Sequence, residues 1–252
     1  MRFEYKYVVD NKHLSSIREM ILPFVDQDNN AIDSPEGHYT VRSIYFDTPA
    51  LDFYFEKIEG IRNRKKLRIR GYDEGGPDDL VFLEIKRKYS IPILKHRAAL
   101  KYDEAVKMFR ERHINGFFPM HEGPGSRDDA RRFFYHLYSK NLRPVVLVVY
   151  DREPWLCKFD STIRITFDKN LRGKAYPGLE DLYSEQDLIY ALPGKFIMEV
   201  KFNDKFPYWL SPVLARYGLK KRSASKYTMC MRAAGLGRTT SEKDVLFRSK
   251  WS

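Results

Sequence analysis

The chain has 252 residues, with 45 lysines and arginines against 34 aspartates and glutamates, and a formal net charge of +11. Its 43% of hydrophobic and 15% of aromatic residues are enough for a large buried core, so one β-rich domain is expected. Cys157 and Cys230 lie in apolar surroundings without metal-site spacing, which argues against a cysteine metal site. No apolar run is long enough for a signal peptide or a membrane span, so we expect a cytoplasmic protein with no transmembrane segment of its own.

The net charge fits phosphorylated small molecules, polyphosphate, nucleic acid or an anionic membrane equally well. The positions of the basic residues are more specific, because they fall within strand-like alternation and not in a lysine-rich tail. A structured binding pocket is therefore favoured over a flexible basic arm.

Hydrophobic periodicity predicts strands and helices over most of residues 1–236, while residues 237–252 are expected to form a weakly ordered tail. The predicted elements, in chain order, are a strand over 3–7, a helix from Asp10 or Asn11 to Leu22, strands over 39–46, 62–70, 80–88 and 94–98, helices over 102–113 and 126–138, strands over 145–150, 161–168 and 196–203, and a helix over 209–217.

The most basic predicted strand carries its charges on a single face. Side chains alternate between the two faces of an extended strand, so the apolar Leu67 and Ile69 face away from the basic residues. Those basic residues are Arg62, Arg64, Lys66, Arg68 and Arg70.

The same two-residue period places charged side chains on one face of six further segments. The charged or polar pairs are Glu4 and Lys6, Glu84 and Lys86, Lys95 and Arg97, Tyr150 and Arg152, Arg164 and Asp168, and Glu199 and Lys201.

Two arrangements of these faces are compatible with the alternation. An antiparallel sheet usually turns its polar face to water, and each Glu-x-Lys motif could then be a cross-strand ion pair of small energetic value. These faces, however, concentrate arginine and lysine and hold few small polar residues. A barrel with the charged faces inward would require a polyanion, most simply a chain of phosphates.

The chain has no Walker loop, dinucleotide-binding glycine fingerprint or Ser-His-Asp order. Phosphoryl transfer depends mainly on positioning and charge neutralisation, which a ring of arginine and lysine can supply. Carboxylates among these cations are natural ligands for Mg²⁺ or Mn²⁺ bridging phosphate oxygens.

Several motifs together resemble the VTC-type polyphosphate polymerase domain of the triphosphate tunnel metalloenzymes, which include the CYTH proteins. The resemblance spans about Phe3 to Tyr227. The motifs that carry it are Glu4-Tyr5-Lys6-Tyr7, Tyr45-Phe46-Asp47-Thr48-Pro49, the strand from Arg62 to Arg70, Glu84-Ile85-Lys86, Glu199-Val200-Lys201 and Ser225-Lys226-Tyr227. Tyr5 replaces the family's usual arginine, at a position that faces away from the charged side chains.

The resemblance implies an α+β fold, in which an antiparallel β-barrel tunnel with a charged lumen is covered outside by amphipathic helices. It also implies that the γ-phosphoryl of ATP passes to a growing polyphosphate chain, with Mn²⁺ or Mg²⁺. The implied catalytic residues are Lys6, Arg68, Arg70, Lys86, Arg152, Arg164 and Glu199. The implied substrate-binding residues are Arg62, Arg64, Lys66, Lys95, Arg97, Lys201, Ser225 and Lys226, and the metal ligands Glu199, Glu4 and Glu84.

Two other functions use the same charged faces. A tunnel triphosphatase would pass the phosphoryl group to water, and the sequence does not decide between water and phosphate as acceptor. A non-catalytic binder of polyphosphate or nucleic acid is the other alternative. Nucleic acid is disfavoured, because base stacking needs exposed aromatics among the basic residues and here most aromatics alternate onto the opposite face.

Overall fold

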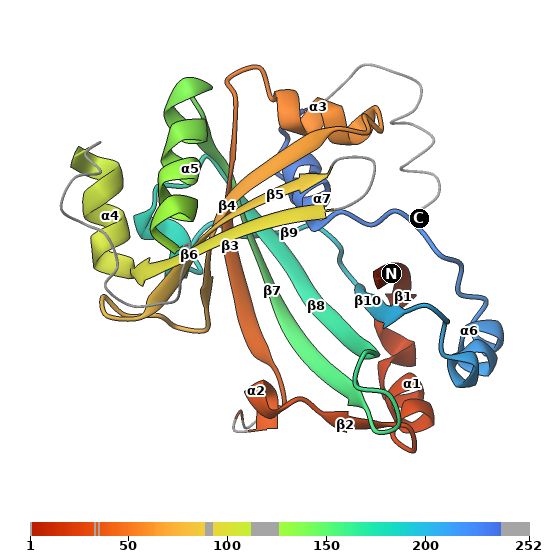
Figure 1. The fold of residues 1–252 in the computed structure, drawn as a ribbon. Helices are drawn as coiled ribbons and strands as arrows, with labels where there is room; N and C mark the ends of the chain where they lie inside the picture. Colours follow the sequence, from red (N-terminus) through yellow and green to blue (C-terminus); the bar gives the residue numbers. More distant parts are fainter. Residues whose placement is uncertain (1, 33, 35, 89–92, 112–125, 238–252) are drawn as a thin grey trace.

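The structure is a computed structural model that describes residues 2–32, 34, 36–88, 93–111 and 126–237 (Figure 1). One curved antiparallel sheet runs through it in the order β1-β10-β8-β7-β3-β4-β5-β6, with β2 paired to β7 and β9 to β8. The strands are β1 (Arg2–Asp10), β2 (Val25–Gln27), β3 (Tyr39–Asp47), β4 (Arg64–Tyr72), β5 (Leu80–Lys88), β6 (Ile93–Lys101), β7 (Arg143–Cys157), β8 (Arg164–Ala175), β9 (Ile189–Tyr190) and β10 (Lys195–Asn203).

The helices lie on both sides of this sheet. They are η1 (Asn11–His13), α1 (Leu14–Ile21), α2 (Asn29–Ile32), α3 (Asp52–Ile58), α4 (Tyr102–Glu111), α5 (Ser126–Ser139), η2 (Glu180–Tyr183), η3 (Tyr208–Leu210), α6 (Ser211–Arg216) and α7 (Lys226–Ala233). The α+β prediction is confirmed.

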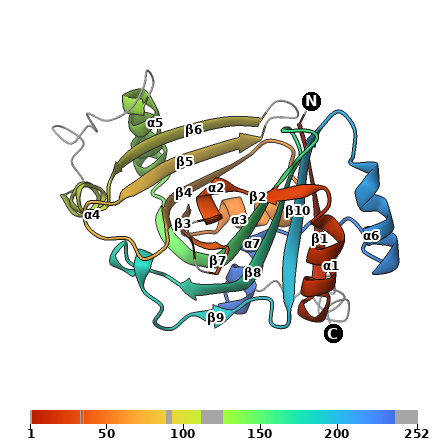
Figure 2. The same cartoon turned by 90° about the horizontal axis from the view of Figure 1, so that it is seen from below.

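The sheet curls strongly, so that β4, β5 and β6 face back toward β1 and β10 across a concave space (Figure 2). Within the described residues, no backbone ladder joins the outer strands β1 and β6. The predicted barrel is therefore a tunnel-like sheet whose ladder stays open, and its concave face forms the lumen.

The convex face of the sheet is apolar and covered by helices, as the alternation predicts. Leu67, Ile69 and Ile85 are fully buried in a core shared with α4 and α5. Ile165 and Val200 are equally buried in a second core with α1 and α6. Burying each of these side chains stabilises the fold by about 1.5–3 kcal/mol.

Helix α7 packs against the concave face, which the sequence analysis did not predict. Tyr45 of β3 is directly paired with Arg68 of β4, so the two side chains share that face. The Tyr45 ring stacks on Tyr227 of α7, with centroids 4.9 Å apart. Gly173 of β8 permits the close approach, because a Cβ there would lie 2.8 Å from the Cys230 Cβ. Part of the lumen is thus filled by helix α7.

Some predicted boundaries are wrong. Strand β4 begins at Arg64, and Arg62 lies in a bend before it. Helices α3 and α7 were not predicted as helices. Helix α4 ends at Glu111, and residues 112–125 and the tail from residue 238 onward lie outside the described residues. Both cysteines are buried and free, as expected.

Candidate functional site

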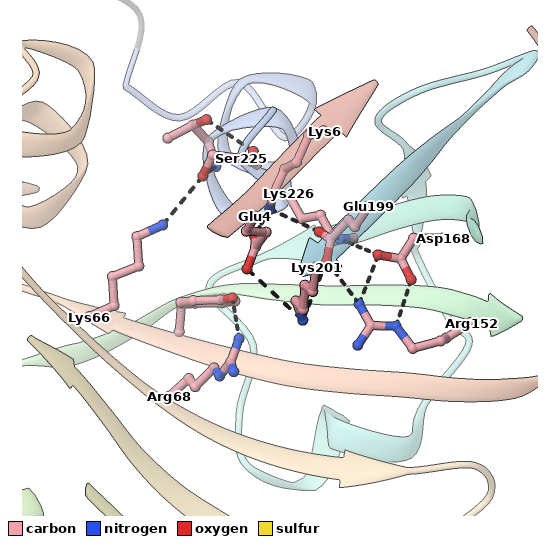
Figure 3. A network of polar contacts seen from close by, with 12 residues as sticks. Glu4, Lys6, Lys66, Arg68, Arg152, Asp168, Glu199, Lys201, Ser225 and Lys226 are labelled. Carbon is pink, nitrogen blue, oxygen red and sulfur yellow. Dashed lines mark hydrogen bonds and ion pairs between the residues drawn. The ribbon is translucent and has the colours of Figure 1, made fainter. Parts of the chain in front are cut away.

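Glu199 is the centre of a buried network of charges in the lumen (Figure 3). Its side chain on β10 is only 5% exposed. Lys6 Nζ lies 2.8 Å and Lys226 Nζ 2.6 Å from Glu199 Oε1, while Arg152 Nη2 and Lys201 Nζ lie 3.6 Å and 3.9 Å from Oε2. Burial alone would raise the pKa of Glu199, but these cations hold it well below its usual range.

Asp168 of β8 completes this network, although the sequence analysis did not assign it to the site. It is fully buried and accepts two hydrogen bonds from Arg152, of 2.7 and 2.8 Å. Lys226 Nζ also contacts Asp168, so this lysine bridges it to Glu199. Despite burial, the pKa of Asp168 is lowered by Arg152 and Lys226. The two buried carboxylates fix the positions of Arg152 and Lys226.

Glu84 of β5 anchors a second group of cations on the opposite wall of the lumen. Arg68 contacts Glu84 Oε2 through Nε at 2.7 Å and Nη2 at 2.6 Å. Around the same carboxylate lie Lys95 at 3.2 Å and, at 3.8 Å each, Arg70 and Arg97. Burial opposes ionisation, but Arg68, Arg70 and Lys95 lower the pKa of Glu84 to about 2.

Three lysines form a row beside Glu84, and Lys95 is the member that contacts the Glu84 carboxylate. Lys66, Lys86 and Lys95 stand directly opposite one another across β4, β5 and β6. Within the described part of the chain, no carboxylate lies within ion-pair distance of Lys66 or Lys86. Like charges directly opposite one another are destabilising. This row is an excess of positive charge at which an anion would be stabilised.

Lys66 shows that the walls of the lumen approach each other. Burial lowers the pKa of Lys66 well below its usual value, and Lys6 of β1, Lys57 and Lys86 of β5 lower it further. Strands β1 and β5 lie near opposite ends of the sheet order, yet cations of both strands lower the pKa of the same lysine. The curled sheet therefore brings these two strands close together. Lys66 Nζ also donates to Ser225 Oγ at 3.3 Å, at the start of α7 (Figure 3).

The remaining predicted residues make other contacts. Arg164 contacts Asp28 Oδ2 at 3.0 Å and Tyr39 Oη at 3.5 Å. Arg62 is exposed in the bend before β4, and Arg64 donates to the Ile61 carbonyl oxygen at 2.8 Å. The structure thus does not bring Arg62 and Arg64 to the network around Glu199.

Asp47 joins the two helices that approach the lumen. It is fully buried and accepts hydrogen bonds from the backbone N–H groups of Thr48, Phe53 and Tyr54, and from the Tyr227 hydroxyl at 2.7 Å. Burial raises the pKa of Asp47 although these donors oppose the change. Asp47 therefore ties the beginning of α3 to α7.

Aromatic side chains also occur on the cationic face, contrary to the argument used against nucleic acid. The Tyr45 ring lies 5.6 Å from the Arg68 guanidinium, and the Tyr150 ring 4.6 Å from Lys226 Nζ. Both tyrosines are buried, so neither offers an exposed surface for base stacking.

The predicted metal ligands differ in how well they fit a divalent cation. Glu4 Oε1 and Glu199 Oε1 lie 3.0 and 2.8 Å from the same Lys6 ammonium, so two carboxylates converge on one position. The part of the chain that the structure describes holds no cluster of three or more His, Cys, Asp or Glu suited to a metal. Glu4 and Glu199 fit an ion whose other ligands are phosphate oxygens and water. The charged groups that act most strongly on Glu84 are the cations Arg68, Arg70 and Lys95, so Glu84 fits a metal ion less well.

Comparison with known proteins points to one family. The model of the VTC domain family matches residues 1–234. The vacuolar transporter chaperone complex subunit 4 of Schizosaccharomyces pombe is 24% identical over 145 residues, which cover 52% of this chain and 20% of that protein. The matched segment therefore spans about a fifth of that relative's length.

One solved structure shares the fold. A Hippeastrum protein, a proposed adenylyl cyclase with a dominant triphosphatase activity, has a TM-score of 0.52 at 12% identity, covering 92% of this chain and 96% of that one. A proposed adenylate cyclase of Bacillus halodurans has a TM-score of 0.49 at 14% identity, with coverages of 89% and 94%. Among the described residues, the helices are too short or too polar to cross a membrane.

Proposed function

The chain belongs to the VTC domain family, and we propose that it is a polyphosphate polymerase that transfers the γ-phosphoryl group of ATP to a growing polyphosphate chain. The observation that carries this proposal is the row of Lys66, Lys86 and Lys95, whose charges face one another without a carboxylate at Lys66 or Lys86. A phosphate chain supplies the missing negative charges at regular spacing. A reducing compartment suits the two free cysteines, and we place the enzyme in the cytoplasm.

In this proposal the two walls of the lumen have different tasks. Lys6, Lys66, Lys86, Arg68 and Arg70 bind phosphate oxygens, with arginine suited to two-point contacts. Lys95, Arg97 and Lys201 extend the same positive lining. Arg152 and Lys226, held by Asp168 and Glu199, remain fixed while the substrate binds. Such preorganised charge requires no rearrangement during transfer.

Glu4 and Glu199 would hold the Mn²⁺ or Mg²⁺, which when bound neutralises charge on the phosphate oxygens. Binding there requires Lys6 to leave the position between the two carboxylates. An oxygen of the terminal phosphate of the acceptor attacks the γ-phosphorus, the bond from that phosphorus to the β–γ bridging oxygen breaks, and ADP leaves. Because the acceptor is already anionic, no general base is needed.

Ser225 and Lys226 close the α7 end of the lumen. The Ser225 side chain caps α7 by accepting from the Thr228 N–H, and it also accepts from Lys66. We assign Arg164 to one mouth of the lumen, where Asp28 restrains it. Arg62 lies in the bend before β4 and Arg64 is held by the Ile61 carbonyl oxygen, so we leave both out of the substrate-binding set.

A triphosphatase is the second candidate, because the same cations would bind a triphosphate that is attacked by water. The fold shared with the Hippeastrum protein, described with a dominant triphosphatase activity, favours keeping this alternative. Only the acceptor differs between the two reactions.

The test is incubation of the purified protein with γ-labelled ATP and Mn²⁺, followed by electrophoresis of the products. A polymerase gives a ladder of long labelled polyphosphate, whereas a triphosphatase gives labelled orthophosphate alone. Lys66→Gln should abolish the ladder, and Lys107→Gln, on the exposed face of α4, should leave it unchanged. Absence of both products from the folded wild-type protein would contradict an enzymatic function.

A further inference from the structure

A second basic pocket lies outside the lumen, at the end of the sheet where β4 begins. It has a volume of about 220 Å³ and is lined by Phe53 and Glu56 of α3, Asn63 before β4, Arg64 and Lys65 of β4, Arg87 of β5, and Lys140 just after α5. Lys65 and Arg87 alternate with the lumen residues of their strands, so they face the convex side. The pocket and the lumen are therefore on opposite faces of the sheet.

The charges of this pocket are unbalanced. Four of its lining residues are cations and only Glu56 is an anion. Lys65 and Arg87 stand directly opposite one another across β4 and β5, which is an unfavourable pairing of like charges. For the described residues, no carboxylate lies within ion-pair distance of Lys65 or Lys140. The pocket is thus arranged to accept negative charge.

The same excess of positive charge lowers the pKa values of two basic groups at the pocket. Burial lowers the pKa of Lys65, and Arg87 and Lys140 lower it further, although Glu56 opposes the change. The neighbouring His136 of α5 has its pKa lowered to about 4 by burial and by Lys65, Arg87 and Lys140. A positive potential that suppresses protonation of both groups would stabilise a bound anion.

We propose that this pocket binds a small phosphate-bearing anion of the size of pyrophosphate, independently of the lumen. The guanidinium group of Arg87 suits two-point contacts with phosphate oxygens, and Lys65 and Lys140 add charge from two sides. The inner face of the pocket is closed by Phe53, whose ring is buried in the core. Glu56 opposes this binding, because it is an acidic residue that lines the pocket and its carboxylate repels an anion.

The site can be tested by titrating the ¹⁵N-labelled protein with pyrophosphate in the absence of metal and following backbone amide shifts. Saturable shifts should occur at residues 53–65 and 140–142, separately from those around Lys6, Glu199 and Lys226. Lys65→Gln and Lys140→Gln should each weaken the pocket affinity roughly fivefold, whereas Glu56→Gln should strengthen it roughly threefold. Lys107→Gln is the matched control for loss of one surface charge and should have no effect.

Folding can be checked separately, because removal of one of several like charges should leave the melting temperature unchanged or raised. Arg68→Ala should weaken the lumen shifts only, which distinguishes this site from the proposed catalytic function. The proposal is overturned if the pocket amides do not respond while the lumen amides saturate. It is equally overturned if Lys107→Gln weakens the pocket affinity as much as Lys65→Gln.

Discussion

Replacement of Glu84 by glutamine should destabilise the protein markedly at neutral pH. The Glu84 carboxylate contacts Arg68 at 2.6 Å and Lys95 at 3.2 Å, and its pKa is about 2 against a usual value of 4.5. Each tenfold change in proton affinity corresponds to about 1.4 kcal/mol, so the ionised side chain contributes about 3 kcal/mol. Because the pKa of the folded state is depressed, this contribution is fully present above pH 4.5 and is lost as the pH falls toward 2.

The measurement is urea unfolding of wild type and Glu84→Gln at pH 7 and pH 3. The difference in unfolding free energy should be about 3 kcal/mol at pH 7 and about 1.4 kcal/mol at pH 3. Glu19→Gln, an exposed carboxylate on α1, is the control and should change stability by less than about 0.5 kcal/mol. A difference between wild type and Glu84→Gln that is the same at both pH values would refute the ion-pair interpretation of Glu84.

Three further predictions concern the lumen. Arg70→Ala should weaken triphosphate binding by about 1.5–3 kcal/mol while the fold is retained, and unchanged affinity by calorimetry would remove Arg70 from the phosphate site. Glu199→Gln should still bind triphosphate, more tightly without metal, yet lose Mn²⁺-dependent turnover by orders of magnitude. Full turnover with only a lower melting temperature would make Glu199 a structural ion-pair partner. Burial lowers the pKa of Lys201 to about 8, although Glu199 and Glu4 oppose the change. Because Lys201 loses its positive charge as the pH rises through about 8, the metal-free affinity for triphosphate should fall over that range. Lys201→Arg should keep its affinity at pH 9, because an arginine stays charged there, and an equal loss in both proteins would contradict a contact between Lys201 and phosphate.

Alternation was sufficient to place the two faces of the sheet. Because the side-chain period of a strand is two, Leu67 and Ile69 had to face away from Arg68 and Arg70, and the structure buries both apolar residues under helices. The same rule failed at Arg62, since the charge pattern continues through a bend that precedes β4. Alternation gives a direction only where the chain is extended.

Features that depend on contacts between distant segments could not be read from the sequence. Asp168 belongs to the site through its pairing with Arg152, which requires the register of β8 on β7. Helix α7 fills part of the concave face because Gly173 leaves space for Cys230. Neither the register nor this space has a local signal. The sequence therefore predicted a phosphate contact for Lys226, and neither of its buried carboxylate partners, Asp168 and Glu199, was predicted.

The most direct test of a phosphate acceptor follows the γ-phosphoryl group when the reaction is run in H₂¹⁸O. Incubation with ATP and Mn²⁺ is monitored by ³¹P NMR, which distinguishes phosphorus in a phosphoanhydride chain from orthophosphate and detects an attached ¹⁸O. A polyphosphate polymerase should give growing chain-internal phosphorus signals with no ¹⁸O at the newly formed linkages. Orthophosphate carrying one ¹⁸O per ATP consumed, with no chain signals, would show that water is the acceptor and would contradict the proposed polymerase.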